Sequence, residues 1–207
     1  DLQSEAVTGA PLLTLRGTKD ASNELPACVR RERELRELMD SRRLDFNMVP
    51  LLGSVQDGRR LESIYRTYQV KTVYHAAAYK HVPMLEQHVR EAVYNNVIGT
   101  RIVADAADRY GVKEFVEIST DKAVNPTNVM GCTKRVAEIY CQNLNAHSNT
   151  SFVTVRFGNV LGSAGSVIPL FQKQIEKGGP VTVTDPRMER YFMTIPEACQ
   201  LIMQTTV

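Results

Sequence analysis

KEFVEIST (residues 113–120) is a short β-rich run that ends in two hydroxyl residues. Three similar runs flank it in the chain: FNMVPLLG (46–53), KTVYHAAA (71–78) and SFVTVRFGN (151–159). Apolar runs of this length, bounded by turn residues, are typical of buried strands. The four runs therefore predict the strands of one sheet, and 181–184 adds a brief strand.

A helical pattern follows or separates these strands. Apolar residues recur at helical spacing between them, and Gly178-Gly179-Pro180 ends one such stretch. The predicted helices cover about 58–68, 93–110, 130–144, 168–177 and 195–207. Strands that alternate with helices predict the α/β class, with a doubly wound, Rossmann-like parallel sheet covered on both faces.

The N-terminal part does not fit this scheme. Residues 1–30 have two prolines and little periodicity, so we expect an irregular segment there, without a strand–turn–helix unit. RRERELRELMDSRR (30–43) predicts a helix of mixed charge with a solvated face. The expected organisation is one Rossmann-like domain over 31–207, in which about 159–207 begins a substrate-binding part.

Composition excludes several classes of protein. The 207 residues are 43% hydrophobic and 23% charged, which is ordinary for a globular domain. The net charge of +2 argues against a nucleic-acid partner. The four cysteines lack metal-ligand spacing, so we expect no metal site and reduced thiols of a cytoplasmic protein. Neither a signal peptide nor a membrane-spanning apolar run is predicted.

Four motifs carry a resemblance to one family. They are VYHAAAYKHVPMLEQHVREAVYNNVIGT (73–100), STDKAVNPTNVMGCTKR (119–135), VRFGNVLGSAGSVIPLF (155–171) and TDPRMERYFMTIPEA (184–198). The chain from about Gly53 onward resembles the CapD-like polysaccharide biosynthesis proteins, extended short-chain dehydrogenases that act as UDP-N-acetylglucosamine 4,6-dehydratases. The resemblance implies a lyase with bound NAD or NADP and a UDP-sugar substrate. It also implies a homo-oligomer, and full-length relatives tethered to the cytoplasmic face of a membrane.

The dehydration needs an acid and a base beside a nicotinamide. By resemblance, Asp121 is the acid that protonates the departing C6 hydroxyl, and Lys122 is the base at C5. Thr120 would hydrogen-bond the substrate near C4. A solvated Asp-Lys turn is the alternative interpretation of the dipeptide alone.

Met130 and Lys134 match the Tyr-x-x-x-Lys pair of short-chain dehydrogenases, with methionine in place of tyrosine. The sequence context resembles the long, membrane-tethered branch of the family, in which methionine is usual. A thioether cannot accept a proton, so Asp121, Lys122 or a water would take the C4 hydroxyl proton. Lys134 would bind the nicotinamide ribose, and Met130 alternatively is a core residue at a helix start.

The resemblance also supplies contacts with the cofactor. Those expected with NAD or NADP are Asp57, Ala76, Ala77, Ala78, Asn96, Ser119 and Lys134. The small alanines let the backbone approach the dinucleotide, Asp57 would bond the adenine, and Asn96 would stabilise the backbone of the active site. Helix capping or a surface role is the alternative for Asp57 and Asn96.

Contacts with the UDP-sugar form a second group. Those expected are Lys80, His81, Asn159, Ser166, Arg187 and Arg190. A guanidinium can grip two phosphate oxygens at once, although one of the two arginines is expected to be only a surface charge. His81 alone would more often be structural.

The glycine-rich nucleotide turn is the main departure from the family. AVTGA (6–10) resembles the start of that turn, but Leu12 and Leu15 stand at two glycine positions and Pro11 removes an amide donor. A corrupted stretch over 10–30 is our hypothesis for this loss. The substrate lobe that the family carries would lie beyond the last residue. The altered glycine turn supports an inactive family fragment as one alternative function, and a sugar-nucleotide epimerase on the same fold is the other.

Overall fold

A computed structural model describes residues 12–16, 36–43, 47–162, 167–183 and 185–206 of the chain. For 12–16 it describes the backbone.

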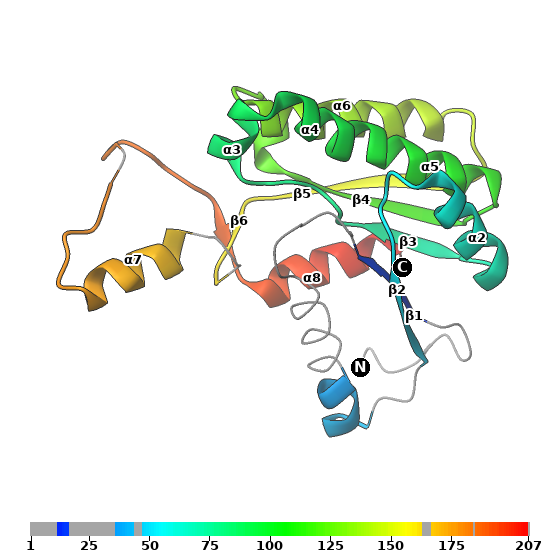
Figure 1. The fold of residues 1–207 in the computed structure, drawn as a ribbon, viewed down its shortest axis with the longest axis horizontal. Helices are drawn as coiled ribbons and strands as arrows, with labels where there is room; N and C mark the ends of the chain where they lie inside the picture. The colour runs from blue at the N-terminus through cyan, green and yellow to red at the C-terminus, as the bar shows by residue number, and fades with distance from the viewer. Residues whose placement is uncertain (1–11, 17–35, 44–46, 163–166, 184, 207) are drawn as a thin grey trace.

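A parallel sheet of three strands forms the centre of the fold (Figure 1). Strand β4 (Glu114–Thr120) lies between β3 (Thr72–His75) and β5 (Ser151–Phe157). Phe115 and Val116 in β4 are fully buried, so both faces of this strand are covered, as expected for a parallel sheet of the α/β class.

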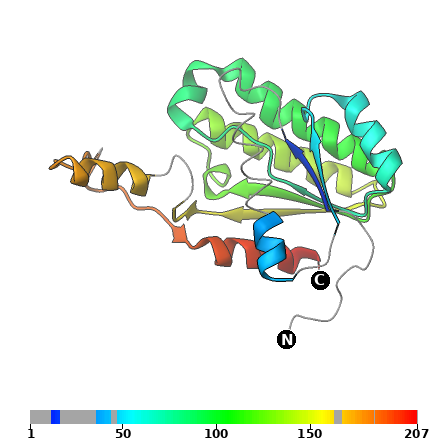
Figure 2. The same ribbon diagram turned by 60° about the horizontal axis from the view of Figure 1, so that its bottom comes forward.

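Most helices cover one face of this sheet (Figure 2). They are α2 (Gly58–Tyr68), α3 (Val82–Gln87), α4 (Val89–Val93), the π-helical turn η1 (Tyr94–Gly99), α5 (Thr100–Arg109) and α6 (Val129–Asn145). Helix α8 (Ile195–Met203) lies on the opposite face. The core between sheet and helices joins Phe115 to Leu61, Val103, Cys141 and Phe152. The predicted α/β class is confirmed, although η1 interrupts the helix predicted over 93–110.

A second, separate sheet corrects one expectation. Leu12–Arg16 forms β1, which pairs in parallel with β2 (Met48–Leu52), so the prediction of no strand within 1–30 was wrong. The strands of a doubly wound fold lie in the order 3-2-1-4-5-6. The described strands fit this order if β1 and β2 are its strands 2 and 3, and if β3, β4 and β5 are its strands 4, 5 and 6. Residues 6–10, where the sequence resembles the start of the nucleotide-binding turn, lie outside the described residues.

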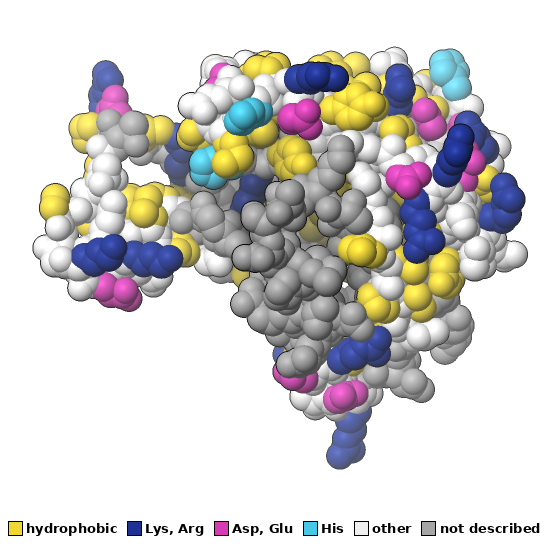
Figure 3. All heavy atoms as spheres, in the orientation of Figure 1, with side chains coloured by type: hydrophobic (Ala, Val, Ile, Leu, Met, Phe, Trp, Pro, Cys, Tyr) yellow, Lys and Arg dark blue, Asp and Glu magenta, His cyan; other side chains and the backbone are white. Residues whose placement is uncertain are grey.

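Residues 167–183 and 185–191 form an arm beside the main body (Figure 1). Helix α7 (Val167–Glu176) in this arm buries no residue, and Leu170 and Ile175 on it are exposed. Figure 3 shows hydrophobic side chains on the surface of the arm. The strand predicted over 181–184 is wrong for the described residues 181–183, because Thr182 donates its backbone N–H to the Gln174 side chain instead of to a neighbouring strand.

Two short strands join the arm to the body. Strand β6 (Asn159–Val160), directly after β5, pairs in parallel with β7 (Phe192–Met193). Thr194 then caps α8 reciprocally with Glu197. Of the mixed-charge helix predicted over 30–43, residues 36–41 are helical and 30–35 lie outside the described residues.

Candidate active site

The carboxyl end of β4 carries a compact polar cluster. The Thr120 hydroxyl donates to Asp121 Oδ1 at 2.9 Å. Lys122 Nζ donates to the same oxygen at 2.9 Å and to Asn159 Oδ1 at 3.0 Å. Ligands of doubly wound sheets bind at the carboxyl ends of strands. The structure thus brings three predicted catalytic residues together with one predicted substrate contact.

These hydrogen bonds decide the charge of Asp121. Partial burial alone would raise its pKa, but the hydrogen bonds from Lys122 and Thr120 outweigh burial and hold the pKa below its usual value. Asp121 is therefore a carboxylate at neutral pH, paired with the Lys122 ammonium. The side chains of Asp121 and Lys122 are each 27% exposed, which leaves the pair accessible to a ligand.

Helix α6 starts in close contact with this cluster. Its N-cap, Asn128, accepts the backbone N–H of Gly131 at 2.8 Å. A Cβ on Gly131 would lie 2.4 Å from the backbone oxygen of Lys122, so only glycine fits against the turn. The close approach fixes the Asp121–Lys122 turn against the helix that carries Lys134.

Asn96 connects three elements from a fully buried position. Its side chain accepts the backbone N–H of Tyr79 at 2.8 Å and donates to the Tyr79 carbonyl at 3.0 Å and to Thr133 Oγ1 at 3.0 Å. These bonds hold the segment after β3 against α6. The π-helical turn η1 places this asparagine, and such turns often occur at functional sites.

The segment that Asn96 holds carries several predicted contacts. Ala77 and Ala78 are half-buried, whereas Ala76 is exposed. Lys80 and His81 are exposed, and His81 precedes the first turn of α3. Asp57, in contrast, is the N-cap of α2 and accepts the backbone N–H of Arg60 at 3.0 Å.

Ser119 belongs to a buried network rather than to an open surface. Its hydroxyl donates to Glu138 Oε1 at 2.5 Å, and Arg156 grips the same carboxylate through Nε at 2.8 Å and Nη2 at 2.5 Å. Burial raises the pKa of Glu138, but the hydrogen bonds from Arg156, Ser119 and Arg135 bring it below its usual value. Sequence reasoning missed Glu138, because two of its partners, Ser119 and Arg156, lie on strands that are distant from it in the chain.

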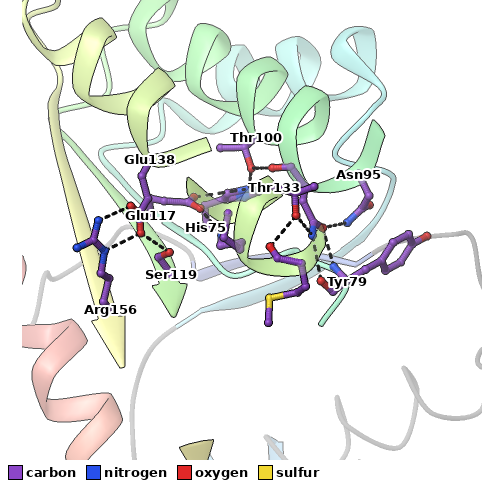
Figure 4. A network of polar contacts seen from close by, with 12 residues as sticks. His75, Tyr79, Asn95, Thr100, Glu117, Ser119, Thr133, Glu138 and Arg156 are labelled. Atoms are coloured by element: carbon purple, nitrogen blue, oxygen red, sulfur yellow. Dashed lines mark hydrogen bonds and ion pairs between the residues drawn. The ribbon is translucent and has the colours of Figure 1, made fainter. Parts of the chain in front are cut away.

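A second buried network surrounds Lys134. Its side chain is 5% exposed and its ammonium donates to Glu117 Oε1 in the middle of β4. His75 Nε2 lies 2.9 Å from Thr100 Oγ1 and 3.9 Å from Glu117 Oε2 (Figure 4). Sequence reasoning also missed Glu117, although a charged residue inside the apolar run KEFVEIST was the available signal. Lys134 therefore faces the sheet.

Met130 lies in the hydrophobic core. It is 5% exposed and packs with Leu85 and Ala92, beside Tyr79 and Val82. This burial corresponds to the alternative interpretation of Met130 as a core residue at a helix start.

A family match places the chain among known proteins. Residues 22–207 match the family model described as "Polysaccharide biosynthesis protein". The chain belongs to this family. The probable polysaccharide biosynthesis protein EpsC of Bacillus subtilis (strain 168) is 61% identical over 153 residues, which cover 74% of the chain and 26% of that relative.

Two further relatives of this chain have the names of enzymes. The UDP-N-acetylglucosamine 4,6-dehydratase (inverting) of Campylobacter jejuni subsp. jejuni serotype O:2 is 38% identical over 73% of the chain and 46% of that relative. The UDP-glucose 4-epimerase of Rickettsia rickettsii (strain Sheila Smith) is also 38% identical, over 78% of the chain and 48% of that relative. The chain thus spans about a quarter to a half of the length of these relatives.

A solved structure supports the fold. The X-ray structure of Pen from Bacillus thuringiensis matches with a TM-score of 0.75 and 39% identity, over 84% of the chain and 54% of that protein. Within the described ranges, none of the helices is long and apolar enough to cross a membrane. The same ranges contain no group of three or more side chains that could hold a metal ion.

The remaining predicted contacts lie in or near the arm. The Arg187 side chain is 88% exposed and donates two hydrogen bonds to the Asp185 carboxylate. Arg190 is exposed as well. Glu189, Arg190 and Tyr191 line an open hollow. The Tyr191 carbonyl accepts the backbone N–H of Asn159 at 2.8 Å, so this hollow adjoins the strand that carries Asn159. Ser166 lies outside the described residues.

Proposed function

We propose that the chain carries the reacting core of a sugar-nucleotide 4,6-dehydratase, which converts UDP-N-acetylglucosamine to a UDP-4-keto-6-deoxy sugar for surface polysaccharide. The observation that carries this proposal is the Asp121–Lys122 pair at the carboxyl end of β4, joined by a hydrogen bond of 2.9 Å beside Asn159. The elimination of water from C5 and C6 needs an acid and a base in adjacent positions. The name of the Campylobacter jejuni relative supports the same reaction.

A proton transfer inside the pair supplies both groups. If Lys122 passes one proton to Asp121 across their hydrogen bond, the ion pair becomes a neutral amine and a carboxylic acid. A substrate that excludes water from the site favours this neutral pair, because desolvation disfavours charges. Lys122 then takes the C5 proton, and Asp121 gives its proton to the departing C6 hydroxyl, which leaves as water. This elimination leaves an ammonium and a carboxylate. When hydride returns to C6, the Lys122 ammonium gives a proton back to C5, and the proton released earlier from the C4 hydroxyl restores the ammonium.

NAD or NADP, when bound, supplies the hydride acceptor at C4 and the hydride that returns to C6. The structure fits a dinucleotide in part: Ala77 and Ala78 follow β3 on a backbone that Asn96 fixes, so small side chains stand at the carboxyl end of the strand. Lys134 would hold the ribose hydroxyls. Met130 is buried in the core, so the C4 hydroxyl proton would pass to Asp121, Lys122 or a water.

A UDP-sugar epimerase is the second candidate, since the Rickettsia rickettsii relative carries that name at the same identity. Epimerisation at C4 needs hydride transfer but no acid that expels water. The paired Asp121 and Lys122 have no task in that reaction, which favours the dehydratase.

Mass spectrometry of the products separates these functions. The protein is incubated with UDP-N-acetylglucosamine and NAD or NADP, and we expect a product lighter by one water. A product of unchanged mass from the UDP-sugar would indicate the epimerase, and the absence of any product would indicate an inactive chain. The Asp121→Asn variant should lose the dehydrated product, while Glu62→Gln, which changes an exposed ion pair between α2 and α5, should keep it.

A further inference from the structure

The Glu117–Lys134 pair is the least expected feature of the central strand. Glu117, labelled in Figure 4, is completely buried in the middle of β4. Lys134 reaches it from α6, and its ammonium donates to Oε1. Oε2 of Glu117 has no hydrogen-bond partner among the described residues. A buried carboxylate with one unsatisfied oxygen depends strongly on its single cation.

His75, the nearest other group, cannot replace that cation. The Thr100 hydroxyl donates its one proton to the Asn96 carbonyl at 2.7 Å, so it must accept from His75, and Nε2 of His75 carries the proton. Burial, with Lys134 nearby, lowers the pKa of His75 to about 3. The imidazole is therefore neutral at physiological pH and already bonded to Thr100.

The other titratable groups near Glu117 do not help either. Glu138 on α6 is an ionised carboxylate, and its charge disfavours that of Glu117. Burial raises the pKa of the Cys141 thiol to about 12, so it stays neutral. On the neighbouring strand β5, the residue that pairs with Glu117 is Thr154, which carries no charge. Lys134 is the cation that the described residues bring to Glu117.

We propose that Glu117 is a positioning residue that holds Lys134 on the sheet side of α6, and that a dinucleotide must draw the ammonium away from Glu117 before Lys134 can bind its ribose hydroxyls. This inference rests on the proposed function, because that function assigns Lys134 to the ribose. It adds that Glu117, which touches no ligand, sets the affinity for the dinucleotide through Lys134.

The competition has a consequence for protons. Burial already raises the pKa of Glu117 beside Lys134, and when Lys134 leaves, the buried carboxyl group has no cation left to favour its charged form. Glu117 then takes up one proton as the dinucleotide binds. Binding that takes up a proton weakens as the pH rises, by up to about tenfold in the dissociation constant per pH unit.

Lysine acylation tests the contact without any cofactor. Wild-type protein, Glu117→Gln and the control Glu114→Gln, which lies at the other end of β4, react briefly with an acetylating reagent, and peptide mass spectrometry follows Lys134 and Lys122. We expect Lys134 to react at least about tenfold more slowly than Lys122 in wild type and Glu114→Gln, since a buried ammonium in an ion pair is a poor nucleophile. Lys134 in Glu117→Gln should react faster, with Lys122 unchanged. Equal rates of the two lysines in wild type would overturn the proposal.

Fluorescence titration with NADH or NADPH tests the competition between pH 6.5 and 8.5. Wild-type affinity should fall with rising pH, whereas Glu117→Gln should bind at least about tenfold more tightly at the highest pH and show no such dependence. A flat wild-type profile overturns the proposal even if Glu117→Gln does not fold, and so does weaker binding by a folded Glu117→Gln. If neither protein binds a dinucleotide, the cofactor assignment fails and the competition with it, whereas the acylation result still decides whether Glu117 holds Lys134.

Discussion

Two lysine–carboxylate pairs lie at strand β4, one at its exposed carboxyl end and one in the core. At its tip, Asp121 and Lys122 are each 27% exposed. A few residues earlier, Glu117 is 0% and its partner Lys134 5% exposed. The same two functional groups are open to solvent at the tip and buried in the core inside the sheet, and the proposed function gives proton transfer with a substrate only to the pair at the tip. Solvent access, more than residue type, separates a reactive pair from a structural one.

Removal of the buried cation should have the largest effect. Lys134→Met leaves the Glu117 carboxylate without its partner, which should lower the free energy of unfolding by about 3–5 kcal/mol in urea denaturation. The double variant Glu117→Leu/Lys134→Met removes both charges and should recover most of that loss. A cost below about 1 kcal/mol for the single variant would contradict the buried pair.

Loss of one charge from the Asp121–Lys122 pair at the end of β4 should lower the activity and leave the free energy of unfolding almost unchanged. Asp121→Asn should slow product formation at least about a hundredfold, equivalent to about 2.7 kcal/mol, because the acid that expels water is lost. Its free energy of unfolding should change by less than about 1 kcal/mol, as for partly exposed ion pairs. Rates come from the mass-spectrometric assay and stability from urea denaturation. A stability loss as large as that of Lys134→Met would remove the contrast between the two pairs.

The contact of Gly131 on α6 with the backbone of Lys122 joins the two pairs, and a larger side chain would strain it. Gly131→Ala places a Cβ against the Lys122 backbone oxygen and should cost about 1–3 kcal/mol of unfolding free energy. Gly58→Ala is the matched control, because its Cβ would lie 3.5 Å from Ile102 in ordinary contact. Thermal denaturation should leave this control as stable as wild type. If Gly131→Ala is as stable as wild type, α6 does not pack closely against the Asp121–Lys122 turn.

His75 should give the buried network a pH dependence. An unfolded histidine takes up a proton below about pH 6.5, whereas the folded protein resists protonation down to about pH 3. Stability should therefore fall as the pH drops through 6.5, by up to about 1.4 kcal/mol per pH unit. His75→Gln should flatten this slope in urea denaturation, and the exposed His88→Gln should keep it. An unchanged slope in His75→Gln would mean that other groups cause it.

Sequence reasoning found the elements whose signal is local. Strands β2 to β5 and helices α2, α6, α7 and α8 follow from short apolar runs and helical spacing, and all were predicted near their observed bounds. The missed β1 and the strand that was wrongly predicted at the described residues 181–183 depend on whether another strand lies beside them, which no local pattern encodes. Pairing with β2 makes Leu12–Arg16 a strand.

The sequence alone determined the α/β fold, the family and the adjacency of Asp121 and Lys122, since each of these is written in residues close together in the chain. Only the tertiary structure decided the partner of each charged group. Lys134 meets Glu117 from 17 residues away, and Lys122 meets Asn159 from 37 residues away. The free energy of a charge depends on burial and on the groups that the fold brings to it, and neither can be read from its neighbours in the chain.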